Sequence, residues 1–293
     1  MNICVAINRC FVAGLRYGSH IFGTDDSLIT EPMLLGVLNV MCGFVAVIET
    51  AWIIFYLFTT QLSYDYERLD SLPCFAIHVF LSIWLAYSVP YHYWKARSAR
   101  PIPLPKEGDG PKCTPCGAPK PKLTSHCSTC RTCIYKMDHH CPWIGQCVGA
   151  HNQAHFFLFI FNVFLSTCLV LYVEYAFWVE NWTVWTSTSE ELAASGVKGH
   201  GRKAIFTFVI VVMLQIIMIS FLCTYTFLVS GGLTYVMKLF NKQTDDSKQK
   251  MTLSIVRLRW RQYLAVRRHE WIVQALFIPS DRIVRDMNFF RSN

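Results

Sequence analysis

The sequence predicts an all-α polytopic membrane protein in which a polar, cysteine-rich domain lies between the second and the third of four transmembrane helices. Two observations lead to this prediction. Of the 293 residues, 53% are hydrophobic and only 16% are charged, whereas soluble domains contain about 25% charged residues. In addition, seven of the thirteen cysteines and four of the ten histidines are concentrated in residues 113–152, between two long apolar stretches.

Four apolar stretches are each long enough to cross the roughly 30 Å hydrocarbon core of a bilayer as a helix. They cover residues 33–58, 72–94, 155–178 and 204–229. The predicted organisation is therefore an N-terminal segment (1–32), two transmembrane helices (33–94), the cysteine-rich domain (95–154), two further transmembrane helices with a loop between them (155–229) and a C-terminal tail (230–293).

The distribution of Lys and Arg predicts which side of the membrane each polar segment faces. Residues 95–154 contain nine of these residues and residues 230–293 contain twelve, whereas residues 61–71 contain one and residues 181–203 contain three. Because cytosolic loops are enriched in Lys and Arg, we expect the cysteine-rich domain and both termini to face the cytosol. A glycosylation sequon at Asn181, in the opposite and therefore lumenal loop, agrees with this orientation.

The cysteines and histidines of residues 113–152 have the spacing of zinc ligands. Cys-x2-Cys pairs near histidines are typical of closed zinc sites, and a reducing cytosol keeps such thiols available. In chain order the residues are Cys113, Cys116, His126, Cys127, Cys130, Cys133, His139, His140, Cys141, Cys147 and His151. Two tetrahedral sites need eight ligands, but the seven cysteines with His126 and one of His139 or His140 provide nine. One thiol is therefore expected to remain free.

Cys141 is the strongest candidate for this free thiol, because Asp138, His139 and His140 lie directly before it. An imidazole can activate a neighbouring thiol as a nucleophile, and a carboxylate can hold that imidazole in the required tautomer. Spacing alone leaves an alternative open, in which Asp138 caps a turn and Cys141 is one more zinc ligand.

The segment from Asp138 to Trp143, followed by Cys147-Val148-Gly149 and Asn152, resembles the DHHC protein S-acyltransferases, membrane enzymes that palmitoylate cysteines of other proteins. The resemblance covers the cysteine-rich domain closely and the four-helix layout loosely. It implies two structural Zn²⁺ ions, one bound by Cys113, Cys116, His126 and Cys133, and the other by Cys127, Cys130, His140 and Cys147. It also implies that Cys141 is the nucleophile, that His139 is its base and that Asp138 orients His139.

The same resemblance implies the reaction partners and the location. Palmitoyl-CoA would transfer its acyl group to Cys141, which would pass it to a cysteine of a membrane-associated client protein. The acyl chain would lie in an apolar cavity near Trp143, in the bilayer of the Golgi or the endoplasmic reticulum. Four basic residues are candidates for contacts with the CoA phosphates, with simple solubility of the domain as the alternative: Lys120, Lys122, Arg131 and Lys136.

The chain departs from the family pattern at several positions. Gln146 replaces an asparagine, Leu123 replaces an arginine, and the segment Thr234-Tyr235-Val236-Met237 lacks the glutamate of a Thr-Thr-x-Glu motif. Lost contacts of this kind imply lower efficiency or an accessory protein. The competing function is a zinc-stabilised membrane scaffold or pseudoenzyme that binds client proteins without acylating them.

Residues 255–268 of the tail alternate between basic and apolar side chains. Next to four transmembrane helices, this pattern favours a helix that lies on anionic lipid. We expect no nucleic acid as a partner, although the same stretch contains five arginines that would suit one: Arg257, Arg259, Arg261, Arg267 and Arg268.

Overall fold

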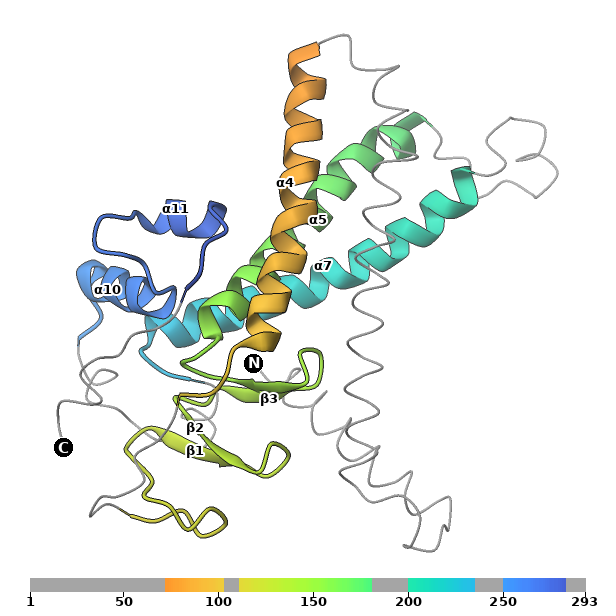
Figure 1. The fold of residues 1–293 in the computed structure, drawn as a ribbon. Coiled ribbons are helices and arrows are strands. Elements are labelled where there is room, and N and C mark those ends of the chain that lie inside the picture. The colour runs from red at the N-terminus through yellow and green to blue at the C-terminus, as the bar shows by residue number, and fades with distance from the viewer. Residues whose placement is uncertain (1–71, 103–110, 181–199, 235–249, 283–293) are drawn as a thin grey trace, which may run out of the picture.

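The computed structural model describes residues 72–102, 111–180, 200–234 and 250–282. Within these ranges, the chain forms three long helices: α4 (Leu72–Ser98), α5 (Gln153–Glu180) and α7 (His200–Ser230). The three helices come together beside the small β-strands and diverge away from them (Figure 1). The first predicted transmembrane stretch, 33–58, and the sequon at Asn181 lie outside the described residues.

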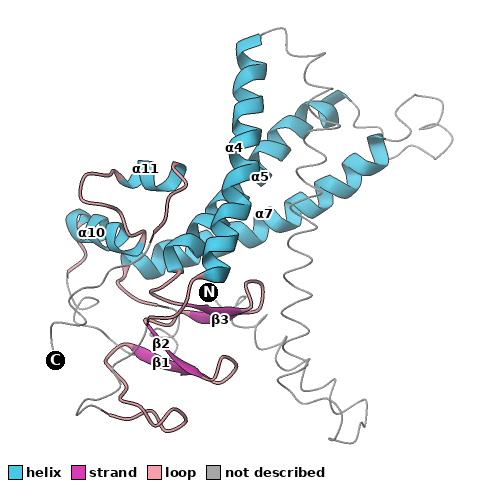
Figure 2. Cartoon of the chain, in the orientation of Figure 1, coloured by secondary structure: helices cyan, strands magenta, loops and turns pink. Residues whose placement is uncertain are grey.

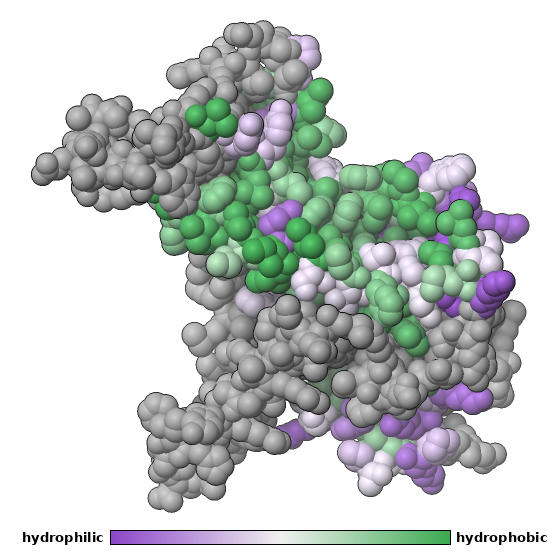
Figure 3. Space-filling model, turned by 180° about the vertical axis from the view of Figure 1, so that it is seen from behind, coloured by the Kyte–Doolittle hydropathy of each residue, from purple (hydrophilic) through white to green (hydrophobic). Residues whose placement is uncertain are grey.

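The described helices match the second, third and fourth apolar stretches of the sequence. Two segments, Gln153–Tyr172 and Ile205–Ser230, are long and apolar enough to cross a membrane. Helix α5 packs against α4 on one side and α7 on the other. Figure 3 shows apolar residues gathered over the helical part of the molecule and hydrophilic residues at the end that holds the cysteine-rich domain. This division agrees with helices that face lipid and a domain that faces water.

The cysteine-rich domain consists of two β-hairpins (Figure 2). In the first, β1 (Thr124–Cys127) pairs antiparallel with β2 (Thr132–Tyr135). In the second, β3 (His139–Cys141) pairs antiparallel with β4 (Gln146–Val148). The prediction of an all-α protein therefore describes the long helices but misses both hairpins. Strands of three or four residues are too short to produce a clear alternating pattern of apolar residues.

Two amide side chains attach the second hairpin to the end of helix α4. Gln146 Nε2 donates hydrogen bonds to the carbonyl oxygens of Ala96 and Arg97, both at 2.6 Å. Asn152 Nδ2 donates to the Ala96 oxygen at 3.0 Å and to the Cys147 oxygen at 3.1 Å. The last carbonyls of a helix have no partner within the helix, so these amides satisfy them and fix the hairpin at the same time.

The tail contains two short helices, α10 (Leu253–Tyr263) and α11 (Ile272–Phe277). Helix α10 packs on the end of α7, where the buried Arg259 donates to the Ser230 oxygen at 2.5 Å. Arg261 donates to the backbone oxygens of Glu270 and Arg267. These two arginines were grouped above with a lipid-facing or nucleic-acid-facing surface. That assignment is wrong for Arg259, which is buried, whereas Arg261 is partly exposed and binds carbonyls of the chain itself.

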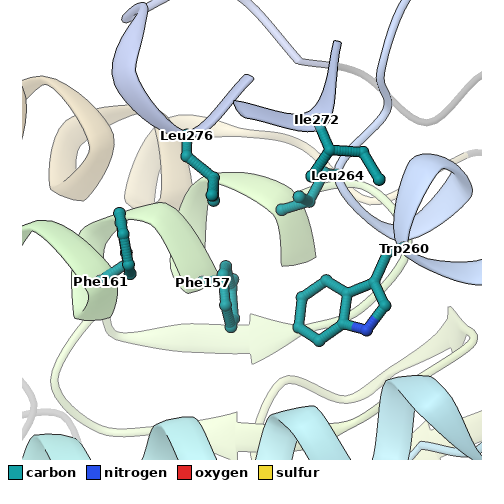
Figure 4. A pocket seen from close by; sticks show the side chains of 6 residues that line it. All are labelled: Phe157, Phe161, Trp260, Leu264, Ile272 and Leu276. Carbon is teal, nitrogen blue, oxygen red and sulfur yellow. The ribbon is translucent and has the colours of Figure 1, made fainter. Parts of the chain in front are cut away.

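The tail and helix α5 enclose an apolar pocket of about 230 Å³. Its lining side chains face a common space (Figure 4) and come from α5, α10, α11 and the segment between the tail helices: Phe157, Phe161, Trp260, Leu264, Ile272 and Leu276. Helix α11 also contacts α4, since Trp84 Nε1 donates to the Phe277 oxygen at 3.0 Å. The tail is thus packed along the helices rather than separate from them.

Arg282 links the tail to itself and to helix α5. Its side chain is 1% exposed and donates hydrogen bonds to both carboxylate oxygens of Glu270, at 2.8 and 3.2 Å. Its backbone nitrogen donates to His155 Nε2 at 3.0 Å. The hydrogen bonds from Arg282 lower the pKa of Glu270. The stability that this pair contributes is therefore present above the ordinary carboxyl pKa and is lost as the pH falls through the lowered value.

We predict that Arg282→Ala destabilises the folded tail, because it leaves the partly buried Glu270 carboxylate without its main partner. Breaking a buried pair costs about 3 kcal/mol, so the melting temperature of the purified protein in detergent should fall by several degrees. The exposed Arg268 is the matched control, and Arg268→Ala should leave the melting temperature within about 1–2 °C of wild type. Equal melting temperatures for Arg282→Ala and wild type would contradict the assigned role of the pair.

Candidate functional site

The first hairpin brings together one group of four potential zinc ligands: Cys113, Cys116, His126 and Cys133. The Nδ1 atom of His126 lies 3.6, 3.2 and 3.8 Å from the sulfur atoms of the three cysteines in that order. Zinc bound tetrahedrally at about 2.3 Å from sulfur and 2.0–2.1 Å from nitrogen separates its ligands by about 3.5–3.8 Å. The group therefore has the dimensions of a closed Cys3His site.

The second group joins the two hairpins: Cys127, Cys130, His140 and Cys147. His140 Nδ1 lies 3.7 Å from Cys127 Sγ, 3.3 Å from Cys130 Sγ and 3.7 Å from Cys147 Sγ. These separations again fit tetrahedral zinc. Two Cys3His groups thus fit two structural zinc sites, and no fifth ligand position is needed in either.

Strand register explains how each hairpin supplies a histidine and a cysteine to one site. His126 lies directly opposite Cys133 in the first hairpin, and His140 lies directly opposite Cys147 in the second. Residues directly opposite each other in an antiparallel pair extend to the same face of the sheet. The turn between β1 and β2 contributes Cys130 to the other site, so the two zinc sites are interleaved along the chain.

Strand β3 directs the side chain of His140 to one face and the side chains of its two neighbours to the other. Because successive side chains of a strand extend to opposite faces, His139 and Cys141 share the face opposite to the one that presents His140. Consistent with this, the His139 ring packs edge-on against Phe156 of helix α5, with the ring centroids 5.4 Å apart. Cys141 is 3% exposed and belongs to an apolar cluster with Ala96, Ile144 and Phe156. The free thiol therefore lies toward the long helices and away from the second zinc site.

Asp138 and His139 form a hydrogen-bonded pair. His139 Nδ1 lies 3.0 Å from Asp138 Oδ2, and Asp138 is 6% exposed. Burial disfavours a positive charge on His139, but its interactions with Asp138 and Cys141 outweigh burial and raise the pKa of His139 to about 10. A hydrogen bond from Nδ1–H to the carboxylate leaves Nε2 as the atom that can exchange a proton with a thiol. These interactions favour the imidazolium form of His139.

Two contacts with Asp138 and its neighbour come from Tyr225, which the sequence analysis did not identify, and from Thr234, which it named only as part of the incomplete Thr-Thr-x-Glu motif. Tyr225 of helix α7 donates a hydrogen bond from its hydroxyl group to Asp138 Oδ2 at 2.7 Å. Thr234, which follows α7, donates from Oγ1 to the Met137 oxygen at 3.1 Å. Eighty-seven residues separate Tyr225 from Asp138, so no local sequence pattern could have indicated this contact.

The four basic residues that were candidates for CoA contacts lie in or beside the first hairpin. Lys120 and Lys122 precede β1, Arg131 lies in the β1–β2 turn, and Lys136 follows β2. Cys141 and the half-exposed Trp143 belong to the second hairpin and its turn. A further basic residue, Arg97 of helix α4, donates to the Ile144 oxygen at 3.4 Å beside this turn, and the sequence analysis missed it.

His151 belongs to neither zinc group and lies between β4 and α5. It is 5% exposed, and burial lowers its pKa to about 4. His151 is therefore neutral at physiological pH and packs beside Gly149. A Cβ atom added at position 149 would lie 3.5 Å from the His151 imidazole and 2.7 Å from the Ile134 side chain. Gly149 thereby permits close contact between the hairpins.

Comparison with known proteins shows which family this part of the chain resembles. Residues 106–243 match the family described as DHHC palmitoyltransferase. Palmitoyltransferase ZDHHC16A of Danio rerio is 43% identical over 86 residues, which are 28% of this chain and 22% of the relative. Probable protein S-acyltransferase 14 of Arabidopsis thaliana is 34% identical over 132 residues, which are 45% of this chain and 40% of the relative.

Palmitoyltransferase ZDHHC3 of Homo sapiens is also similar, with 43% identity over 82 residues that make up 27% of each chain. The aligned segments cover less than half of the length of these curated relatives. Within the family, Lys136-Met137 and the segment 271–280 resemble the sixteenth human member, and the match to ZDHHC16A agrees with this resemblance.

We predict that Cys133→Ser and Cys147→Ser each remove one of two bound zinc ions. Each substitution leaves only three of the four ligands of one closed site. Elemental analysis of the purified protein should give about two zinc ions per chain for wild type and about one for each variant. Cys223→Ser, at an exposed thiol on helix α7, is the matched control and should retain both. Two zinc ions in either ligand variant would contradict the assignment.

Proposed function

We propose that this chain, in which residues 106–243 form a DHHC palmitoyltransferase domain, is a protein S-acyltransferase with Cys141 as its nucleophile. One observation supports this function above all: Cys141 lies outside both zinc groups and follows His139, which is hydrogen-bonded to the buried Asp138, and both lie on the face of β3 opposite the zinc ligand His140. A scaffold that only binds zinc and client proteins has no need for this arrangement.

In the first step, His139 takes the thiol proton of Cys141, and the thiolate attacks the carbonyl carbon of an acyl-CoA. The bond from that carbon to the CoA sulfur breaks, the acyl group is transferred to Cys141, and CoA leaves with the proton from His139. In the second step, His139 takes the proton of a client cysteine, whose thiolate attacks the Cys141 thioester. Cys141 leaves as a thiolate and regains the proton.

Asp138 would hold His139 in the tautomer that presents Nε2 to the thiols. The raised pKa of His139 supports this role, since an imidazolium next to Cys141 stabilises the thiolate in both steps. Each zinc site has four protein ligands, so we assign the two Zn²⁺ ions to the folding of the hairpins and no chemical step to either ion.

The acyl chain would extend from Cys141 toward the long helices. The apolar neighbours of Cys141 support this direction, because they include Ile144, Phe156 and Leu158. A water-borne CoA group would remain on the polar side, where the loop after Cys141 meets Arg97 of helix α4 and Lys120, Lys122, Arg131 and Lys136 lie on the neighbouring hairpin.

The proposed topology has four transmembrane helices, with the zinc-binding domain and both termini in the cytosol. The concentration of Lys and Arg in residues 95–154 and 230–293 supports it. The proposed partners are the bilayer, acyl-CoA and membrane-associated client proteins with cysteines, and an accessory protein is compatible with the departures in the tail. We propose an endomembrane location, in the Golgi or the endoplasmic reticulum.

We predict that the purified protein labels itself when it is incubated with labelled palmitoyl-CoA, and that hydroxylamine releases the label. Cys141→Ser should abolish the label while about two zinc ions remain, because Cys141 is not a ligand. His139→Ala should lower the initial rate by about 100-fold or more, since it removes the proton acceptor. Label that persists in Cys141→Ser would contradict the assigned nucleophile, and no label on zinc-loaded wild type would favour the scaffold function.

A further inference from the structure

Tyr225 connects a long helix to the Asp138–His139 pair. It lies on α7, close to the end of that helix at Ser230, and its side chain is 4% exposed. Its hydroxyl group lies 2.7 Å from Asp138 Oδ2, the same oxygen that lies 3.0 Å from His139 Nδ1. One carboxylate oxygen is thus shared by an imidazole from strand β3 and a phenol from helix α7.

We propose that Tyr225 is a positioning residue for acyl transfer: its hydroxyl group fixes the Asp138 carboxylate so that Asp138 can orient His139. This inference rests on the proposed function and adds a residue from α7 to it. The terminal torsion of an aspartate side chain is broad, so the orientation of the carboxylate depends on the groups that bind it. A hydroxyl donor from a separate element restricts rotation about that torsion.

The energetics of burial favour such a donor. A buried carboxylate loses its hydration and requires hydrogen-bond donors in the protein. Hydrogen bonds from O–H to an ionised oxygen are short, about 2.5–2.7 Å, and are about twice as strong as bonds between neutral groups. The distance from Tyr225 to Asp138 has this value. The hydroxyl group therefore satisfies the buried Asp138 carboxylate and holds it in the position that His139 needs.

Aromatic packing fixes the Tyr225 ring itself. The ring lies against Phe156 and Phe157 of α5, with centroid distances of 6.1 and 6.2 Å, and against Tyr263 of α10 at 6.2 Å. Phe156 also packs against the His139 ring. The same aromatic group thus holds both the phenol and the imidazole that meet at Asp138 Oδ2.

The backbone around Asp138 is held independently of Tyr225. The Asp138 nitrogen donates to the Val148 oxygen at 2.8 Å, and Thr234 binds the carbonyl oxygen of Met137. Removal of the Tyr225 hydroxyl group is therefore expected to loosen the carboxylate without displacing the strand. Because different contacts hold the backbone and the carboxylate, removal of the hydroxyl group can distinguish a positioning role of Tyr225 from a role in folding.

The test is the rate of self-labelling by Tyr225→Phe, which keeps the ring and removes only the hydroxyl group. At saturating palmitoyl-CoA the rate should fall roughly tenfold, in line with the loss of one hydrogen bond to a charged group. The palmitoyl-CoA concentration at half-maximal rate, the zinc content and the melting temperature should stay close to wild type. A wild-type rate in Tyr225→Phe would overturn the proposal.

Tyr263→Phe is the matched control, because Tyr263 packs in the same aromatic group and its hydroxyl group is buried without a hydrogen-bond partner among the described residues. Its rate should equal that of wild type. An equal loss of rate in both variants would show that aromatic packing, rather than the contact with Asp138, is responsible, and would overturn the proposal.

A double-mutant cycle tests whether Tyr225 acts through Asp138. In an Asp138→Asn background, Tyr225→Phe should change the residual rate less than about twofold, because the effects of substitutions at residues that act as one unit are not additive. A tenfold effect of Tyr225→Phe in that background would refute action through Asp138. The same result would refute it even if Tyr225→Phe also affected folding. Unlabelled wild type would instead refute acyl transfer itself, so failure of this proposal and failure of the proposed function give different results.

Discussion

The alternation of side chains along one three-residue strand is the constraint on which the rest of the site depends. In β3, the central residue His140 belongs to the second zinc group, so His139 and Cys141 must extend to the opposite face. A closed four-ligand site is rigid, and it fixes the strand that bears Cys141. The zinc group therefore controls the direction of this thiol, and the separation between the ligand His140 and the proposed nucleophile Cys141 follows from the pleat of the strand.

Two small hairpins cannot bury enough apolar surface to remain folded without help. Metal binding supplies part of the missing stability, and the ends of the long helices supply the remainder. Gln146 and Asn152 bind the last carbonyls of α4, and the end of α7 reaches Asp138 and Met137. The domain is therefore held on both sides by helices that belong to the apolar part of the molecule. Its geometry depends on the arrangement of these helices as well as on zinc.

Local patterns were sufficient to predict the part of the site that is close in sequence. Cys-x2-Cys spacing indicated zinc, and the count of nine ligand candidates for eight positions indicated a free thiol. The hairpins were missed because a metal, rather than an alternating apolar pattern, determines these short strands. The buried position of Arg259 was missed because arginine side chains are usually exposed. The contact between Tyr225 and Asp138 joins residues 87 positions apart, and only the packed fold brings them together.

The contacts of Asp138 also show which interactions remain at the positions where the chain departs from the family pattern. The sequence suggests that the segment after α7 has lost interactions, because Thr234-Tyr235-Val236-Met237 lacks a glutamate. In the structure, Thr234 still binds the backbone directly before Asp138, and Tyr225 binds the carboxylate from within the helix. Similarly, Gln146 in place of asparagine binds two carbonyls of α4. The hairpin that holds Asp138, His139 and Cys141 is thus attached to α4 and α7 by the residues that this chain does contain, so the departures by themselves give no reason to expect an inactive protein.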